Sequence, residues 1–523
     1  MSTPTIGNLD LVLIGAYFLA VFAIGFHVAR QTHSGEDLFL AGRRLGWIPI
    51  GFSLFASNIS STTLIGLTGA AYTWGIAVSN YEWMAALILV VFAVFYIPYY
   101  LNARISTVPE FLEKRFDRRS RRYFSVLTLF SNIVVDTAGS LFAGAVVIKV
   151  FFPDIDLVTA CLLLAIVAGI YTAAGGLAAV VYTDVLQALV LLVGACLLTW
   201  FAFAELGFSW ERVVAVAGSE RLSLILPLDD PNLPWLGTVI GVPVLGFYFW
   251  CTNQFIVQRV LGARNVYHAR RGALFAGLLK LPVLFIMVLP GTMAIALFPE
   301  LENGDMVFPL LMTELLPSGI LGIVLAGLIA AIMSSIDSTL NSASALFTLD
   351  FVRPMRPDLT DKKVALIGRL AILGFMLLAV LIAPVINRFG GLFQYLQTAL
   401  AFLVPPVVVL FVIGLFWRRA TSTGAFLTLV GGHMISALFF VLFVTDVLQL
   451  HFTVIAGLLF VASCALFVGI SLLGQAPDAA AVEQFTFSRD TLADTGAGRA
   501  WSDYRVFATG LIALTVWLVV AFW

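Results

Sequence analysis

Long apolar stretches separated by short polar connections make up almost the whole chain. Fourteen of them reach about 20 residues, the length at which an α-helix crosses ~30 Å of hydrocarbon. They cover residues 10–29, 47–75, 79–102, 121–150, 156–174, 178–205, 234–258, 270–298, 315–350, 364–387, 390–417, 421–446, 450–474 and 505–523. This pattern predicts an all-α polytopic membrane protein with 14 transmembrane helices.

Clusters of polar residues interrupt three of these apolar stretches. Six of the seven residues at 57–63 are polar, as are eight of the eleven at 334–344, and a third cluster occupies 252–254. Hydrocarbon does not hydrate hydroxyls, amides or carboxylates, so such clusters survive only where they line a protein cavity or hold an ion. We expect gaps in the helical backbone near Ile59 and Ser334, as in transporters with discontinuous helices.

The spacing of two interruptions predicts an internal repeat. Asn58 lies in the second apolar stretch and the cluster at 252–254 in the seventh, five helices later. Because five is odd, a repeated five-helix unit would enter the membrane upside down the second time. The sequence therefore predicts a LeuT-type 5+5 inverted-repeat core with one extra helix before it and three after it. The expected parts are 1–46 (first transmembrane helix and cytoplasmic loop), 47–205 (first repeat), 206–233 (extracellular loop), 234–417 (second repeat) and 418–523 (three C-terminal transmembrane helices).

The distribution of basic residues predicts the orientation in the membrane. With the N-terminus outside, the cytoplasmic loops collect 24 of the 29 Lys and Arg residues. The outer loops keep four, and one further basic residue lies within a span: Lys149, Arg212, Arg221, Arg388 and the intramembrane Lys280. Cytoplasmic loops of membrane proteins carry this excess of positive charge. We therefore expect both termini to be extracellular or periplasmic, in a multi-pass protein of the plasma membrane or bacterial inner membrane.

Composition narrows the class of protein further. Hydrophobic residues make up 61% of the 523 positions and charged residues 11%, which leaves too little polar surface for a water-soluble globule. The first apolar stretch lacks the features of a cleaved signal peptide and reads as a retained helix. A net charge of −1 argues against a nucleic-acid partner, and no nucleophile–base pair or metal-ligand spacing indicates an enzyme.

Eight segments give the chain a resemblance to a known family. They read AGRRLGWIPIGFSLFASNIS, YEWM, TVPEFLEKRF, GGLAAVVYTDVLQ, FYFWCTNQFIVQR, MSSIDSTLNSASALFTLD, QYLQ and GLFWRR, in the family's order. The chain resembles the solute:sodium symporter family, specifically its sodium/glucose cotransporter branch in the bacterial type. This resemblance implies a symporter that imports a sugar or sugar-like solute by alternating access, with Na⁺ as the co-transported ion.

The paired serines Ser334 and Ser335 are candidate sodium ligands. Sodium is a hard cation that prefers oxygen ligands, and a broken helix supplies carbonyl oxygens beside hydroxyl side chains. By resemblance, the family's shared sodium site falls on both serine hydroxyls and on the backbone oxygens of Ala56, Ile59 and Ala331. The alternative is that the serines are small residues that allow close helix packing.

Asp184 and Asp337 are candidates for a second cation or proton site. In family members with a second cation, the equivalent of Asp184 contributes together with residues just after the paired serines, here including Ser338. Two acids that face each other share a proton or bracket a cation. The alternative is that Asp184 bonds hydroxyl groups or backbone near a helix end.

Nine residues fall, by resemblance, at positions that face the solute. A sugar site needs bidentate polar groups around the hydroxyls and an aromatic face against the ring. The polar members are Asn58, Thr63, Tyr81, Glu82, Lys280 and Gln397, and the aromatic members are Phe249, Trp250 and Phe393. We expect Glu82 and Lys280 to neutralise each other in the empty pocket, and the alternative is a purely structural ion pair.

Four departures from the family pattern widen the range of solutes. Thr63 replaces a larger Gln or His, Phe249 replaces a gating tyrosine, and Ala85 stands where a serine can occur. Asp136 replaces an amide or a lysine, and its carboxylate could bind a hydroxyl or an amine. Hexoses, inositols or other polyols and amino sugars therefore all stay open. The alternatives are a monocarboxylate, amino acid or sialic acid as solute, or a membrane sensor without net transport.

Overall fold

The computed structural model describes residues 6–152, 154–301, 304–388, 392–477, 479–493 and 503–523. Within these ranges all regular structure is helical, apart from two isolated β-bridges, Leu45 with Ala263 and Leu226 with Pro234. The prediction of an all-α protein is therefore confirmed.

Ten helices among the described residues are long and apolar enough to cross a membrane. They are α1 (Asn8–Ala29), Ile76–Asn102 with α5 (Asn80–Val91) and α6 (Ile97–Asn102), Arg118–Lys149 with α8 (Arg118–Phe130) and α9 (Ala138–Phe151), Gly175–Glu205 from α10 (Leu157–Glu205), Trp235–Thr252 with α12 (Trp235–Phe247), Ile320–Met355 with α17 (Ile320–Leu346) and α18 (Arg353–Met355), α19 (Asp361–Ile382), α22 (Ser422–Val444), α23 (Phe452–Leu473) and α26 (Tyr504–Ala521).

Three further pairs of helices reach spanning length together and are bent by 41° to 56° at a short break. They are α3 (Trp47–Asn58) with α4 (Ser61–Trp74), α14 (Val266–Lys280) with α15 (Leu289–Leu297), and α20 (Leu392–Leu403) with α21 (Pro405–Phe416). Length and composition thus give up to thirteen spans among the described residues, against the predicted fourteen. The predicted stretch 156–174 forms a shorter apolar helix, Leu157–Ile170.

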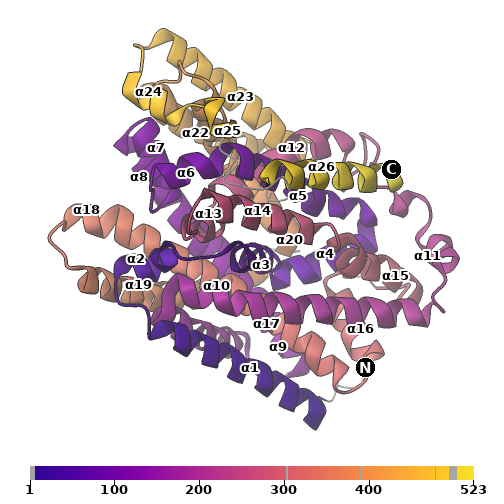
Figure 1. Ribbon diagram of the computed structural model, residues 1–523. Helices are drawn as coiled ribbons and strands as arrows, with labels where there is room; N and C mark the ends of the chain where they lie inside the picture. Colours follow the sequence, from indigo (N-terminus) through magenta and orange to yellow (C-terminus); the bar gives the residue numbers. More distant parts are fainter. Residues whose placement is uncertain (1–5, 153, 302–303, 389–391, 478, 494–502) are drawn as a thin grey trace.

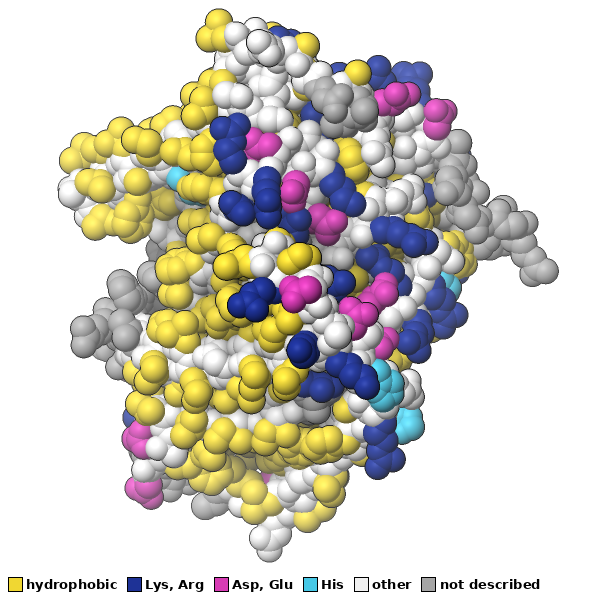
Figure 2. All heavy atoms as spheres, turned by 90° about the vertical axis from the view of Figure 1, so that its left-hand side faces the viewer, with side chains coloured by type: hydrophobic (Ala, Val, Ile, Leu, Met, Phe, Trp, Pro, Cys, Tyr) yellow, Lys and Arg dark blue, Asp and Glu magenta, His cyan; other side chains and the backbone are white. Residues whose placement is uncertain are grey.

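Shorter helices connect the spans, and one of them, α13, is buried inside the bundle. They are α2 (Gly35–Leu40), α7 (Val108–Arg115), α11 (Trp210–Ala217), α13 (Gln254–Leu261), α16 (Val307–Leu315), α24 (Ala479–Phe485) and α25 (Asp490–Ala493). Helices α2, α7, α18 and α24 gather at one end, whereas α11 and α16 lie towards the other, where α1 begins and α26 ends (Figure 1). Lys and Arg side chains crowd the first of these ends, which we name the basic face (Figure 2).

Two of the predicted backbone interruptions are present, and polar side chains cap the helices that follow them. At Ile59 the backbone leaves helical geometry (φ −82°, ψ 83°), and the Ser60 hydroxyl accepts a hydrogen bond from the Thr63 amide at 3.1 Å. Asn253 is extended (φ −70°, ψ 125°), and its side chain accepts from the Phe255 amide at 3.2 Å. These caps satisfy amide groups that a new helix leaves without partners, so the chain can restart a helix inside the bundle.

The predicted gap near Ser334 is wrong, because α17 runs unbroken from Ile320 to Leu346. Three of its hydroxyl side chains, those of Ser335, Ser338 and Thr339, donate to the carbonyl four residues earlier, at 3.0 Å from Ser335 to Ala331 and 2.9 Å from Thr339 to Ser335. Hydroxyl groups in apolar surroundings satisfy themselves in this way without breaking the helix. Every residue from Ala330 to Leu346 is buried, so the polar cluster faces protein rather than lipid.

Candidate functional site

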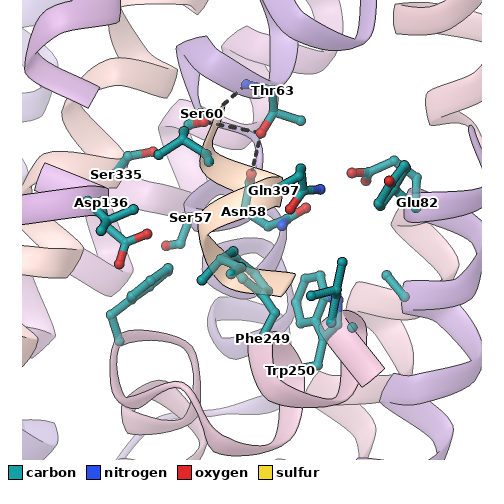
Figure 3. A pocket seen from close by; sticks show the side chains of 18 of the residues that line it. Ser57, Asn58, Ser60, Thr63, Glu82, Asp136, Phe249, Trp250, Ser335 and Gln397 are labelled. Carbon is teal, nitrogen blue, oxygen red and sulfur yellow. Dashed lines mark hydrogen bonds between the residues drawn. The ribbon is translucent and has the colours of Figure 1, made fainter. Parts of the chain in front are cut away.

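A cavity of about 150 Å³ lies where the break between α3 and α4 meets α5, α17 and α20. Its wall includes most of the residues expected to face the solute, and it also contains sodium candidate Ser335. The lining residues are Ser57, Asn58, Ser60, Thr63, Tyr81, Glu82, Ala85, Val135, Asp136, Ser140, Val242, Leu245, Gly246, Phe249, Trp250, Phe255, Ser335, Thr339, Leu396, Gln397 and Leu400. Figure 3 shows Glu82 and Asp136 on opposite sides of this cavity, with Asn58 and Gln397 between them.

The predicted ion pair between Glu82 and Lys280 is present at one side of the cavity. The two charged groups are 2.5 Å apart, and both side chains are buried. Lys280 also donates to the side-chain oxygen of Asn58, the last residue of α3. Its ammonium lies 5.3 Å from the ring centroid of Trp250 and 5.5 Å from that of Phe55. One buried cation therefore connects α5, α14 and the broken end of α3.

Four further predicted solute contacts also line the cavity. Thr63 donates to the carbonyl oxygen of Asn58 at 3.0 Å, across the helix break, and so is engaged within its own chain segment (Figure 3). The ring of Phe249 packs edge to face against that of Trp250, with the ring centroids 5.2 Å apart. Tyr81 and Gln397 are the other two. The side chain of Phe393 lies outside the described residues.

The sodium candidates come from the two elements expected to supply them. Ala56 and Ile59 lie at the end of α3, while Ala331, Ser334 and Ser335 share α17. Contact between the two elements is direct, since Ser57 and Ser338 have their hydroxyl oxygens 3.1 Å apart. Ser335 borders the cavity, whereas Ser334 points elsewhere and donates to Asp184 at 2.6 Å.

Asp184 sits in a buried network that also contains a cation the sequence reading missed. Its carboxylate accepts from Ser53 at 2.5 Å and from Ser57 at 3.3 Å, and the guanidinium of Arg259 lies 3.4 Å away. Arg259, on α13, is almost fully buried and also donates to Ser53, Ser57 and Ser338. Asp337 accepts from the Ser338 hydroxyl at 3.2 Å. Two of the predicted second-ion residues, Asp184 and Ser338, thus contact a guanidinium directly, and Asp337 is bonded to Ser338.

Arg259 escaped the sequence reading because it was counted with the basic residues of a cytoplasmic loop. A signal was nevertheless available in the count of charges within spans. Deep in the spans, away from their ends, four acids, Glu82, Asp136, Asp184 and Asp337, stood against the single base Lys280. Since unpaired charge inside a membrane is costly, this imbalance pointed to a missing cation.

Asp136 is positioned by a local change in helix geometry. Residues Ser131–Thr137 form a π-helical turn between α8 and α9, and such turns occur often at functional sites. Within it the Thr137 hydroxyl donates to the carbonyl oxygen five residues back, Asn132, at 2.6 Å. The Asp136 carboxylate lines the cavity, and its weak hydrogen bond from Ser131 measures 3.5 Å.

Broken helices that meet at a buried polar cavity inside a bundle of apolar spans are the architecture of a secondary transporter. Comparison of the whole fold agrees. The chain superposes with a TM-score of 0.80 on a Na⁺-coupled sialic acid symporter in its substrate-bound outward-open state, at 22% identity over 90% of this chain and 99% of the other. A nucleobase-cation-symport-1 family transporter in a closed conformation gives a TM-score of 0.56, at 15% identity over 87% of this chain and 98% of the other.

Sequence comparison narrows the class to one family. The profile of the sodium:solute symporter family matches residues 38–432. The human sodium/myo-inositol cotransporter 2 is 38% identical over 461 residues, which cover 81% of this chain and 68% of the relative. The rabbit (Oryctolagus cuniculus) sodium/glucose cotransporter 1 is 35% identical over 469 residues, which cover 82% of this chain and 71% of the relative. The protein belongs to the sodium:solute symporter family, whose members couple solute movement to Na⁺.

Proposed function

We propose that this protein imports a hexose, an inositol or other polyol, or an amino sugar together with Na⁺ by alternating access. The observation that carries the proposal is the buried Glu82–Lys280 pair, in which Glu82 lines the cavity and Lys280 holds Asn58 at the broken end of α3. Such a group of donors and acceptors suits a solute with several hydroxyls. The names of the relatives, which include glucose and myo-inositol cotransporters, support the same class.

The size and charge of the cavity support a single-ring solute without a carboxylate. An apolar cavity of similar volume, about 150 Å³, takes up one benzene ring, so one six-membered ring matches the space between Glu82 and Asp136. The Glu82–Lys280 pair is neutral overall, which leaves the carboxylate of Asp136 to set the local charge. A sialic acid or monocarboxylate would bring a second negative charge beside it, and like charges in a closed site are strongly unfavourable.

For sodium we propose the backbone oxygens of Ala56, Ile59 and Ala331 with the hydroxyls of Ser334 and Ser335. External Na⁺ would enter first, join the end of α3 to α17 and complete the solute pocket, so coupling needs only differential affinity. One Na⁺ that crosses about 100 mV gains roughly 2.3 kcal/mol, and a tenfold gradient adds about 1.4 kcal/mol. Together these terms sustain roughly 500-fold accumulation of a neutral solute.

We also propose a second cation or proton site at Asp184, Asp337 and Ser338, which forms when Arg259 moves away. The guanidinium already supplies positive charge to Asp184, so a further cation would have to replace it. The number of charges moved per solute tests this site. A value of one, measured from reversal potentials in proteoliposomes, would rule it out.

The proposed membrane arrangement has 14 spans, with inverted repeats at 47–205 and 234–417 and three helices in 418–523. In it the basic face is cytoplasmic and both termini are outside, in a plasma membrane or a bacterial inner membrane. The concentration of Lys and Arg on the basic face supports this orientation (Figure 2). The variants Ser209→Cys and Ser488→Cys test this orientation. A membrane-impermeant thiol reagent should label Ser209→Cys from outside and Ser488→Cys from inside, and the reverse pattern would contradict the proposal.

The transport proposal is tested by uptake of labelled glucose, myo-inositol and glucosamine into proteoliposomes, with and without a Na⁺ gradient. Ser335→Ala is expected to raise the Na⁺ concentration for half-maximal uptake about tenfold. The reason is that one polar contact, here the Ser335 hydroxyl with Na⁺, contributes about 1.4 kcal/mol to binding. Ser344→Ala is the matched control, since Ser344 lies on the same helix but donates to Gly368 at 2.7 Å. Uptake that is the same with and without Na⁺ and is unchanged in Ser335→Ala would refute coupling. Na⁺-dependent binding of the solute without accumulation would indicate a sensor.

A further inference from the structure

An apolar groove of about 450 Å³ runs between α14 and α26 and shares no lining residue with the solute cavity. Its lining is almost wholly aliphatic and aromatic, with one basic residue. The lining residues are Trp47, Arg271, Leu274, Phe275, Leu278, Val506, Phe507, Gly510, Leu511 and Leu514. Gly510 leaves an open slot in this lining, since a Cβ built there meets no atom within 4 Å.

The basic residue sits at one end of the groove, held among aromatic rings. The guanidinium of Arg271 lies 4.8 Å from the ring centroid of Phe507, 4.9 Å from that of Tyr267 and 5.7 Å from that of Trp47. It donates to the Tyr267 hydroxyl at 2.5 Å. Arg271 follows the start of α14 by five residues, or about 7.5 Å along the helix.

This end of the groove lies towards the basic face in the orientation proposed above. Both α14 and α26 begin there, and exposed Arg264 precedes α14. An aromatic ring of Trp or Tyr beside a half-buried Arg is typical of the level of lipid headgroups. The groove thus combines positive charge at headgroup level with an apolar slot below it.

We propose that the groove binds one anionic phospholipid of the cytoplasmic leaflet, with its phosphate at Arg271 and an acyl chain along Gly510. A partner helix fits less well, because close helix packing in membranes uses small residues at four-residue spacing, and Val506 and Leu514 flank Gly510 at that spacing. Free phosphate would use Arg271 alone and leave the slot unfilled.

A bound lipid would support the packing of α14 on α3. Phe275 of the groove packs edge-on against Trp47 at 5.4 Å and against Phe52 at 5.1 Å. These two helices end at Lys280 and Asn58, which contact each other beside the solute cavity. The lipid is therefore expected to raise thermal stability, whichever solute the protein carries.

The test uses the purified full-length protein and native mass spectrometry with dioleoyl phosphatidylglycerol, dioleoyl phosphatidylcholine and glycerol 3-phosphate. Phosphatidylglycerol is expected to bind about fivefold more tightly than phosphatidylcholine, since one Arg near the surface is worth about 1 kcal/mol. Arg271→Gln should remove that difference, and Gly510→Phe should abolish binding of both lipids to this site. The controls are Arg264→Gln and Gly469→Phe, the latter also at a glycine with no atom within 4 Å of a Cβ.

Three outcomes would overturn the proposal. The first is equal binding of the two lipids to the unmodified protein. The second is lipid binding that survives both Arg271→Gln and Gly510→Phe while thermal unfolding stays normal. The third is saturation of the site by glycerol 3-phosphate, or release of a co-purifying polypeptide by Gly510→Phe, which would assign the groove to a soluble phosphate or a partner helix.

Discussion

Replacing Glu82 and Lys280 singly and together separates a structural ion pair from a solute-binding one. Glu82→Gln removes the negative partner and leaves the Lys280 ammonium buried against Asn58 and two aromatic rings. Lys280→Met leaves a buried carboxylate instead. The double variant removes both charges at once and leaves no unpaired charge. It therefore tests whether the charged groups bind the solute in addition to neutralising each other.

The expected cost follows from the burial of the pair. The side chain of Lys280 is 0% exposed and that of Glu82 is 8% exposed. Loss of one partner from a buried pair leaves an uncompensated charge and costs about 3–5 kcal/mol, whereas neutral replacement of both is often close to neutral. Stability should therefore fall strongly in each single variant and recover in the double variant. Affinity for the solute should not recover, because hydrogen bonds to charged groups are worth about 1.5–3 kcal/mol, or roughly 10- to 150-fold in binding.

Two measurements on the same four proteins decide the matter. Thermal unfolding in detergent reports stability and gives the coupling energy of the double-mutant cycle. Competition uptake in proteoliposomes gives solute affinity. A double variant that is stable and takes up solute with the half-saturation of the unmodified protein would refute the binding role and leave a structural pair. Recovery of stability without recovery of affinity supports direct contact between the pair and the solute.

Three further substitutions test other parts of the site and fold. Asp136→Asn should raise the uptake of glucuronate relative to glucosamine more than tenfold by removing like-charge repulsion, and unchanged competition ratios would contradict that reasoning. Arg259→Gln should lower the unfolding temperature sharply, because a buried carboxylate without its partner costs about 3–5 kcal/mol, and adding Asp184→Asn should restore part of the loss. Gly176→Ala should destabilise the fold by about 1–3 kcal/mol, because the φ of Gly176 is +59° and an added Cβ would lie 2.3 Å from the carbonyl oxygen of Leu38 in α2. Gly374→Ala is the control, since a Cβ there meets no atom within 4 Å.

Polar clusters identified the helix breaks only where a capping residue accompanies them. The clusters at 57–63 and 252–254 contain Ser60 and Asn253, whose side chains accept from amides that start the next helix. The cluster at 334–344 is just as polar, yet Ser335 and Thr339 in it donate backwards to carbonyls of the same helix. Composition gives the location of buried polarity, but the direction of the hydrogen bonds decides whether the backbone opens.

The charged residues were predictable to the extent that both partners lay within apolar stretches. Glu82 and Lys280 met that condition, and their pairing followed from the cost of isolated charge. Arg259 did not, because it follows a helix break and resembles the basic residues that mark a cytoplasmic loop. Only the folded arrangement turns α13 inwards and brings Arg259 to Asp184.

The end of α3 connects the Asp184–Arg259 network with the Glu82–Lys280 pair, and this arrangement implies how ion and solute are coupled. Ser57 bonds into the Asp184–Arg259 network, and Asn58, the next residue, receives the Lys280 ammonium beside the solute cavity. The proposed sodium ligands Ala56 and Ile59 flank them directly. A ligand that fixes this four-residue segment lowers the cost of ordering it for the other ligand, so no separate pathway between the two sites is needed. Because linkage is reciprocal, the factor by which Na⁺ raises solute affinity must equal the factor by which solute raises Na⁺ affinity.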